Sequence, residues 1–212
     1  MFFDLALDKL ASVCHVVGAS EFFEEAFVVG DTDIVIAADG GLRHLLQRNI
    51  RVDVVLGDFD SLGYTPENAI VLPTEKDDTD VLFAVKLGME RGFQTFFLHG
   101  CLGGRMDHSF ANMQILKYIS ESGGRGYLFG ENCTMTAVTD GVLDFGADAM
   151  GTISVFSADD KSTGVDLVGL KYPLDNYTMR NSFPIGVSNE FTGKVSKVSV
   201  GRGTLFVMWQ QI

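Results

Sequence analysis

The order of apolar segments changes about halfway along the chain, and this change constrains the fold more than any other feature. Up to about residue 122, short runs rich in Val, Ile and Phe alternate with segments of helical periodicity. The runs are apolar on both faces, as strands of a covered parallel sheet are, at 13–19, 33–38, 52–56, 69–72 and 95–98. Apolar residues recur at helical spacing at 41–49, 79–91 and 107–120. We therefore predict an α/β domain, a mostly parallel sheet flanked by helices.

The second part of the chain contains no convincing amphipathic helix. After Gly123-Gly124, strand-like runs alternate with turns rich in Gly, Asn and Asp, and the runs lie at 126–129, 134–138, 152–157, 165–170, 194–200 and 204–209. This pattern is typical of an antiparallel β-sandwich or barrel. We predict an α/β domain at 1–122 and an all-β sandwich domain at 123–212, with a boundary between residues 120 and 148.

The composition argues against several classes of function. The formal net charge is −12 and no Lys/Arg cluster occurs, which argues against nucleic acid and against anionic membranes as partners. The cysteines Cys14, Cys101 and Cys133 have neither disulfide-framework nor zinc-site spacing. No apolar run reaches the roughly 20 residues that span a bilayer, and the N-terminal residues lack the pattern of a secretory signal. We expect a cytoplasmic protein.

Acidic residues recur where predicted strands end or helices begin. They are Asp39, Asp58, Asp60, Asp77, Asp80 and Asp107. Asp58 and Asp60 follow a predicted strand and would point the same way in extended geometry, so both can face one ion. Mg²⁺ prefers oxygen ligands and is usually held by one or two carboxylates plus substrate phosphates. The pattern favours a phosphate-handling enzyme with a Mg²⁺ site, although Asp-rich turns and helix N-caps are the structural alternatives.

A glycine-rich turn follows the predicted strand 95–98. It reads Gly100-Cys101-Leu102-Gly103-Gly104-Arg105-Met106-Asp107-His108 and leads into a predicted helix. Glycines at such a turn let backbone N–H groups approach a phosphate, and the helix N-terminus adds positive potential. Arg105 can donate two hydrogen bonds to phosphate oxygens. We favour phosphate binding here over a tight turn with Asp107 as N-cap. The chain contains no P-loop, dinucleotide-binding or nucleophile-elbow motif.

Taken together, these strings resemble the thiamin pyrophosphokinase family, especially its bacterial form. The matching strings follow the right order and spacing over most of the chain, at 38–41, 57–61, 76–80, 103–112, 169–174 and 186–190. The resemblance implies Mg²⁺-dependent transfer of the pyrophosphoryl group of ATP to the thiamin hydroxyl, giving thiamin diphosphate and AMP. It implies that 1–122 is the catalytic, nucleotide-binding domain and 123–212 the thiamin-binding domain. It also implies a homodimer, with thiamin bound between one subunit's β domain and the other's catalytic domain.

The resemblance also implies roles for particular residues. The metal-site carboxylates, which with Arg105 form the catalytic set, would be Asp58, Asp60, Asp77 and Asp80. The residues near the ATP phosphates would be Asp39, Gly103, Gly104, Arg105, Asp107 and Asn112. Ser188, Asn189 and an aromatic residue of the last strand would contact thiamin.

Two assignments stay open at this point. Phe206 and Trp209 are three apart, so in a strand they face opposite sides and only one can stack on thiamin; we favour Phe206. The general base is not identified, and Asp80 is one candidate.

Two other functions remain as alternatives. Asp58-Phe59-Asp60 after a strand imitates the nucleophile motif of haloacid-dehalogenase-type phosphatases, although the β-rich second part of the chain argues against that family. Covalent phosphate on Asp58 would identify such an enzyme. A non-catalytic nucleotide- or thiamin-binding module would bind without releasing AMP.

Overall fold

The computed structural model describes residues 12–210, which divide into two compact units. The described part of the N-terminal unit covers residues 12–115 and 124–131. The described part of the C-terminal unit covers 116–123 and 132–210. The two units are therefore not separated at one position near residue 122.

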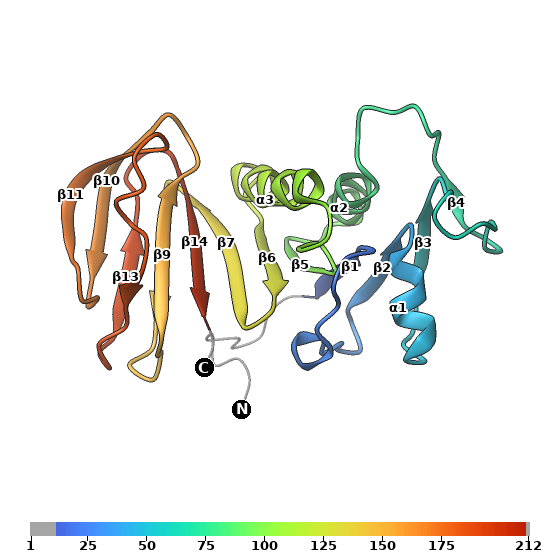
Figure 1. Cartoon of the computed structure of the whole chain (residues 1–212), viewed down its shortest axis with the longest axis horizontal. Helices are drawn as coiled ribbons and strands as arrows, with labels where there is room; N and C mark the ends of the chain where they lie inside the picture. The colour runs from blue at the N-terminus through green and yellow to red at the C-terminus, as the bar shows by residue number, and fades with distance from the viewer. Residues whose placement is uncertain (1–11, 211–212) are drawn as a thin grey trace. The chain divides into compact units, whose positions relative to one another are not determined.

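A parallel sheet forms the centre of the N-terminal unit (Figure 1). Its strands lie in the order β6-β5-β1-β2-β3-β4, and each neighbouring pair is parallel. Their bounds are β1 (Val13–Val17), β2 (Ile34–Ala38), β3 (Val54–Gly57), β4 (Ile70–Val71), β5 (Thr95–His99) and β6 (Arg125–Gly130). Every residue of β1, β2 and β5 is buried, as strands covered on both faces must be.

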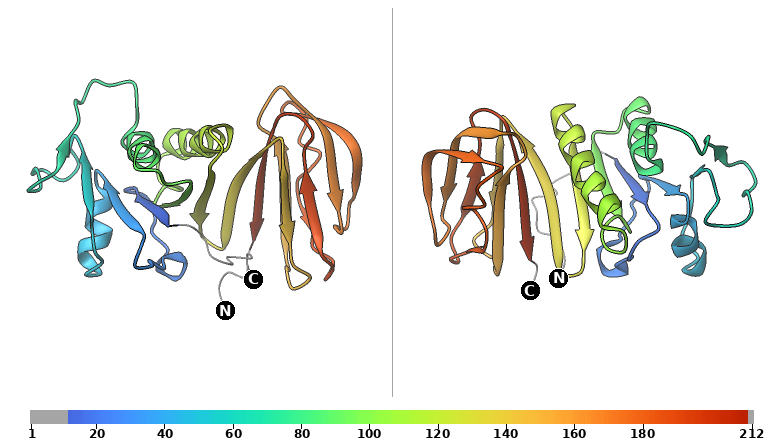
Figure 2. Two further views of the ribbon diagram at one scale, coloured as in Figure 1. Left: turned by 180° about the vertical axis from the view of Figure 1, so that it is seen from behind. Right: turned by 45° about the horizontal axis from the view of Figure 1, so that its top comes forward.

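Helices cover both faces of this sheet (Figures 1 and 2). The helices are η1 (Glu24–Ala26), α1 (Gly41–Gln47), α2 (Asp80–Glu90) and α3 (Met106–Glu121), the last beginning in this unit. On one face, Leu42 and Leu45 of α1 join a buried cluster with Val35 and Ala37 of β2. On the other, Gly88 of α2 lies so close to Cys14 and Phe96 that a Cβ there would come within 2.8 Å and 2.7 Å of their side chains. The predicted α/β fold is confirmed.

The C-terminal unit is an antiparallel β-sandwich, also as predicted. One sheet has the order β12-β9-β14-β7 and the other the order β11-β10-β13-β8, and Figure 2 shows them as two layers. The strands of the first sheet are β7 (Cys133–Thr139), β9 (Thr152–Ser157), β12 (Asn189–Glu190) and β14 (Thr204–Gln210). Those of the second are β8 (Val142–Phe145), β10 (Lys161–Val168), β11 (Leu174–Arg180) and β13 (Ser196–Ser199).

The strands β8, β11 and β12 fall outside the runs expected from the sequence. The run 126–129 does form a strand, β6, but it pairs in parallel with β5 and so belongs to the N-terminal sheet. Within residues 12–210, none of the helices has the length and apolar character that crossing a bilayer would require.

Candidate active site

Three carboxylates converge at one edge of the N-terminal sheet. Asp39 directly follows β2, Asp58 directly follows β3, and Asp80 is the first residue of α2. One oxygen from each of these carboxylates lies within 4.8 Å of the other two. Because β2 and β3 are adjacent and parallel, their carboxyl ends meet at the same edge. The structure thus brings together two predicted metal-site residues, Asp58 and Asp80, with Asp39, which was predicted to lie near the ATP phosphates.

Tight backbone geometry holds Asp39 in this position. Its φ of 47° is left-handed, and its N–H donates to the carbonyl of Leu56 at 2.8 Å. Gly57 lies against it, and a Cβ on Gly57 would come within 3.0 Å of the Asp39 Cα. A Cβ on Gly41, at the start of α1, would lie 1.9 Å from the carbonyl oxygen of Val17. Glycine is therefore required at both positions for the chain to pass this closely.

Two of the three carboxylates have a buried oxygen that suits a cation. Asp39 Oδ1 and Asp80 Oδ1 are shielded from solvent; Asp39 Oδ1 has no hydrogen-bond partner, and Asp80 Oδ1 is contacted by the Lys76 ammonium at 2.9 Å. Burial raises the pKa of the Asp80 carboxyl, Lys76 opposes that rise, and the Asp58 and Asp39 carboxylates add to it. Like charges at this distance are unfavourable unless a cation neutralises them. Oxygen ligands with free lone pairs are what a hard divalent ion prefers, so the donor set fits Mg²⁺.

Lys76 also reaches this group, a contact to which the sequence reasoning assigned no role. Its Nζ lies 2.9 Å from Asp80 Oδ1 and 3.7 Å from Asp58 Oδ2. No spacing rule in the sequence suggests this pair, because Lys76 lies in the irregular connector before α2, where helical spacing does not apply.

Asp60 does not join the group, and the expectation that Asp58 and Asp60 point the same way is wrong. Phe59, between them, has a left-handed φ of 62° and a buried ring, so the backbone is not extended there. The Asp60 N–H donates to Asp58 Oδ1 at 3.2 Å, and the Asp60 residue is exposed. A turn closed by the Asp58 side chain thus replaces the predicted strand geometry.

Asp77 is also outside the group and exposed. In the same stretch, Asp78 forms an ion pair with Lys86, with 2.6 Å between Asp78 Oδ2 and Nζ. Thr79 is the N-cap of α2, since its Oγ1 accepts a hydrogen bond from the Leu82 N–H at 3.2 Å. The cap of α2 is therefore a threonine and not one of the acidic residues of this stretch.

The glycine-rich turn between β5 and α3 is held by side chains from its surroundings. Gly103 and Gly104 have φ values of 87° and 63°, which favour glycine. Ser20 Oγ donates to the Gly103 carbonyl at 2.9 Å, and the Gly103 N–H donates to Ser109 Oγ at 3.1 Å. Asn112 is buried and donates from Nδ2 to the carbonyl of Cys101 at 2.8 Å. Asn112 therefore stabilises the turn, and its contact with ATP stays a prediction.

Arg105 lies directly before α3 and forms a two-point ion pair with Asp107. Its Nη2 is 2.5 Å from Asp107 Oδ2 and its Nε is 3.2 Å from Oδ1. Asp107 is the second residue of α3, so it is not the N-cap. Both side chains are mostly exposed, at 70% and 65%, and an exposed pair of this kind contributes little stability. The guanidinium can therefore exchange its carboxylate partner for a phosphate at small cost.

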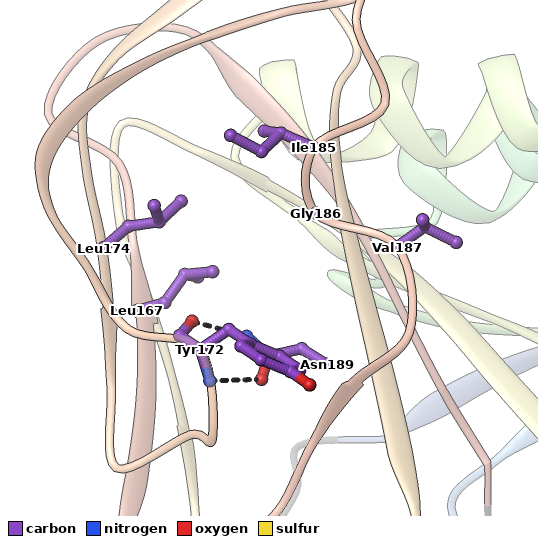
Figure 3. A pocket seen from close by; sticks show the side chains of 7 residues that line it. All are labelled: Leu167, Tyr172, Leu174, Ile185, Gly186, Val187 and Asn189. Carbon is purple, nitrogen blue, oxygen red and sulfur yellow. Dashed lines mark hydrogen bonds between the residues drawn. The ribbon is translucent and has the colours of Figure 1, made fainter.

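In the C-terminal unit, Ser188 and Asn189 are neighbours with different environments. Ser188 is exposed, has a left-handed φ of 56°, and donates its N–H to Ser154 Oγ at 3.0 Å. Asn189 is buried, and its side chain bonds the backbone of Tyr172 twice, with Oδ1 accepting at 2.9 Å and Nδ2 donating at 2.7 Å (Figure 3). Asn189 thus fixes the loop before β11, while Ser188 presents its side chain to solvent.

Phe206 and Trp209 lie on opposite faces of β14. Burial alternates along the strand, with Leu205, Val207 and Trp209 buried and Phe206 half-buried. The Trp209 ring meets Phe145 of the other sheet edge-on, at 5.4 Å between centroids, so it belongs to the core of the sandwich. Phe206 lies on the face that points away from that core. Its position agrees with the choice of Phe206 as the stacking residue, which stays a prediction.

A shallow apolar groove lies beside Ser188 in the same unit (Figure 3). Leu167 of β10, Leu174 of β11 and the segment 185–187 line it, with Tyr172 and Asn189 at one end. No pattern in the sequence predicts this groove, because its lining residues come from elements that only the fold brings together.

Two models of one protein family match most of this chain. The model described as "Thiamin pyrophosphokinase, catalytic domain" matches residues 26–125. The model described as "Thiamin pyrophosphokinase, vitamin B1 binding domain" matches residues 143–205. The two matched segments include the acidic group and the groove, respectively.

Similar proteins and structures agree with these matches. The thiamine pyrophosphokinase of Bacillus subtilis is 26% identical over 182 residues, which cover 82% of this chain and 85% of that protein. Thiamin pyrophosphokinase 1 of Caenorhabditis elegans is 26% identical over 175 residues, covering 74% and 71%. The crystal structure of the Bacillus subtilis enzyme superposes with a TM-score of 0.83 at 23% identity, covering 95% of this chain and 99% of that one. The chain belongs to the thiamin pyrophosphokinase family.

Proposed function

We propose that this chain transfers the pyrophosphoryl group of ATP to the hydroxyl of thiamin and releases AMP. Membership of the family supports this reaction. The structural observation that carries the proposal is the convergence of Asp39, Asp58 and Asp80 within 4.8 Å, with one oxygen each of Asp39 and Asp80 shielded from solvent.

We assign the divalent cation to this group and identify it as Mg²⁺ from the all-oxygen donor set. Asp39, Asp58 and Asp80 would hold it. Asp60 and Asp77 lie outside this group, and Asp→Asn variants at these two positions test whether either takes part in metal binding. When bound, the ion would neutralise and orient the polyphosphate.

The remaining catalytic residues act by binding and orientation. Arg105 exchanges Asp107 for phosphate oxygens, and the Gly103-Gly104 turn and the N-terminus of α3 face the same phosphates. A bond then forms between the thiamin hydroxyl oxygen and the β-phosphorus, while the bond from that phosphorus to the bridging oxygen of AMP breaks. The hydroxyl proton passes to a carboxylate, for which Asp80 is one candidate. Such transfers depend mainly on positioning and charge neutralisation.

We assign thiamin to the C-terminal unit, with Ser188, Asn189 and Phe206 as its contacts. We further propose that the protein is a homodimer in which one subunit's β domain and its partner's catalytic domain share the thiamin site. Exposed apolar side chains close to Ser188 support a covered surface here, since Phe183, Ile185 and Val187 are 61%, 43% and 55% exposed.

Subunit mixing tests the shared site. An Asp58→Asn chain should be inactive, and a Ser188→Ala/Phe206→Ala chain should have little activity at thiamin concentrations far below its raised KM. If the site is shared, one site of the hybrid dimer carries both defects and the other carries neither, so activity returns after subunit exchange. If exchange is demonstrated and no activity returns, each site lies within one chain.

The reaction itself is tested by incubating the protein with ATP, Mg²⁺ and thiamin. We expect AMP and thiamin diphosphate in equal amounts. Release of inorganic phosphate without thiamin, with phosphate covalently bound to Asp58, would indicate a phosphatase instead. Binding of ATP and thiamin without any AMP would indicate a non-catalytic module. We expect this activity in the cytoplasm.

A further inference from the structure

Lys76 lies within the acidic group although none of the roles described above uses it. Its ammonium contacts Asp80 Oδ1 at 2.9 Å and Asp58 Oδ2 at 3.7 Å, and it donates to the carbonyl of Pro73 at 3.1 Å. The Lys76 side chain is only 16% exposed. The contact with Asp80 is an ion pair at hydrogen-bonding distance, and it opposes the rise that burial causes in the pKa of the Asp80 carboxyl.

The ammonium and a divalent cation would compete for the same atoms. Asp80 Oδ1 is one of the two buried oxygens that make the group suitable for a cation, and Lys76 is its nearest charged neighbour. Three carboxylates and one ammonium leave two negative charges to be neutralised, so a divalent ion is still attracted. The ion would nevertheless have to share or take over oxygens that Lys76 already contacts.

Lys76 is also placed so that it can change partners. It lies between β4 and α2, outside any helix or strand, and carries its charge on a flexible four-carbon side chain. An ammonium has three donors and no acceptor, so only an anionic or carbonyl oxygen can replace the carboxylates. In a site that binds ATP, the phosphate oxygens are such a replacement.

We propose that Lys76 is an exchangeable cation: it competes with the divalent ion for Asp58 and Asp80, and it moves to a phosphate oxygen when the ion arrives with the nucleotide. This proposal rests on the function proposed above. It means that the ion alone binds weakly, whereas the ion and nucleotide together bind well, because only the nucleotide offers Lys76 a new partner.

The test compares Lys76→Met with Lys86→Met. Lys86 is the matched control, since it forms an ion pair with Asp78 in the same region and its replacement removes the same charge. Binding of Mn²⁺ alone is measured from the electron paramagnetic resonance signal of the free ion. Binding of ATP with Mg²⁺ is measured by calorimetry without thiamin.

We expect Lys76→Met to change the two affinities in opposite directions. Mn²⁺ alone should bind about tenfold more tightly, because a competing cation is gone, and ATP with Mg²⁺ about tenfold more weakly, because a charge-assisted hydrogen bond is lost. Lys86→Met should leave both affinities within about twofold of the unmodified protein. A merely structural role for Lys76 would weaken both. The proposal is overturned if a Lys76→Met protein with an unaltered melting curve binds Mn²⁺ no more tightly than the unmodified protein does. If Lys76→Met melts at a lower temperature, Lys76→Gln provides the same comparison.

Asp58→Asn separates failure of this inference from failure of the proposed site. If Asp58→Asn loses Mn²⁺ binding while Lys76→Met does not gain it, the site stands and the exchange is wrong. If Asp58→Asn binds Mn²⁺ as the unmodified protein does, both the assigned metal site and the exchange are wrong.

Discussion

Replacing Asp80 by Asn should stabilise the protein in the absence of divalent ions. Asp80 is held close to two other carboxylates, and its side chain is only 21% exposed. The substitution keeps the size and shape of the side chain but removes its charge. Proteins often hold such unfavourable charges at functional sites, where removing them raises stability at the expense of activity.

The size of the effect follows from the distances in the acidic group. With an effective dielectric constant of about 20, unit charges no more than 4.8 Å apart repel by at least about 3.5 kcal/mol, so the two neighbours together oppose Asp80 by at least about 7 kcal/mol. The attraction to Lys76 at 2.9 Å amounts to about 6 kcal/mol by the same relation. The N-terminus of α2 adds about 0.5 kcal/mol in favour of the charge. The repulsion from the two carboxylates thus slightly exceeds the attraction to Lys76 and to the helix N-terminus. Asn also avoids the cost of keeping a charge partly buried, so the substitution should stabilise the folded state by about 1 kcal/mol.

A stabilisation of this size should raise Tm by about 2–4 °C in a chain of this length. Melting curves in EDTA and in saturating Mg²⁺ measure the change. Mg²⁺ should raise the Tm of the unmodified protein and have little effect on Asp80→Asn, because ion binding stabilises only the folded state that can bind it. Glu75→Gln removes an exposed charge from the same connector and serves as the control. A lower Tm for Asp80→Asn in EDTA would refute the reasoning, since the carboxylates would then not be in net repulsion.

Three further predictions follow from the structure. Arg105→Lys should lower kcat/KM for ATP by about ten- to a hundredfold, because lysine lacks the planar fork that meets two phosphate oxygens; an unchanged kcat/KM would mean that Arg105 only pairs with Asp107. Trp209→Ala should lower the free energy of unfolding by about 3–5 kcal/mol with little change in thiamin KM, whereas Phe206→Ala should mainly raise the thiamin KM. Denaturant titration and steady-state kinetics measure the two effects, and the reverse pattern would assign the stacking role to Trp209. Burial lowers the pKa of both His15 and His99 below the ordinary value of 6.5, so the unfolded chain binds protons at a higher pH than the folded chain does, and the free energy of unfolding should fall as the pH drops through about 6.5. Denaturant titrations at several pH values should show a weaker pH dependence for His99→Phe. An unaltered pH dependence would exclude His99 as its source.

The sequence predicts β1, β2 and β5 well because these strands are buried on both faces and so appear as continuous apolar runs. The run at 69–72 forms only the two-residue strand β4, whose side chains are exposed. The sequence predicts β11 poorly, because most of the strand's side chains are exposed or half-buried, as Asn176 and Tyr177 are, and only Met179 is buried. It also cannot assign β6 to a sheet. The apolar run is clear, but its parallel pairing with β5 depends on the fold and not on composition.

The residues of the acidic site likewise differ in how far the sequence predicts their positions. Asp39 and Asp58 could be predicted to meet, because each directly follows a strand and parallel strands end at a common edge. The outward turn of Asp60 could not, since it depends on the left-handed backbone of Phe59, a residue type that rarely adopts it. The contact of Lys76 with two carboxylates depends on the path of an irregular connector, which carries no periodic signal.

The central claim is that the three converging carboxylates hold the divalent ion used in pyrophosphoryl transfer. The most direct test is the initial rate of thiamin diphosphate formation at limiting Mg²⁺, with saturating ATP and thiamin, for Asp39→Asn, Asp58→Asn and Asp80→Asn. We predict that each variant folds and loses at least about a hundredfold in rate, which is the typical scale for losing one group that stabilises transition-state charge. Near-normal rates for all three variants at limiting Mg²⁺ would contradict the assignment.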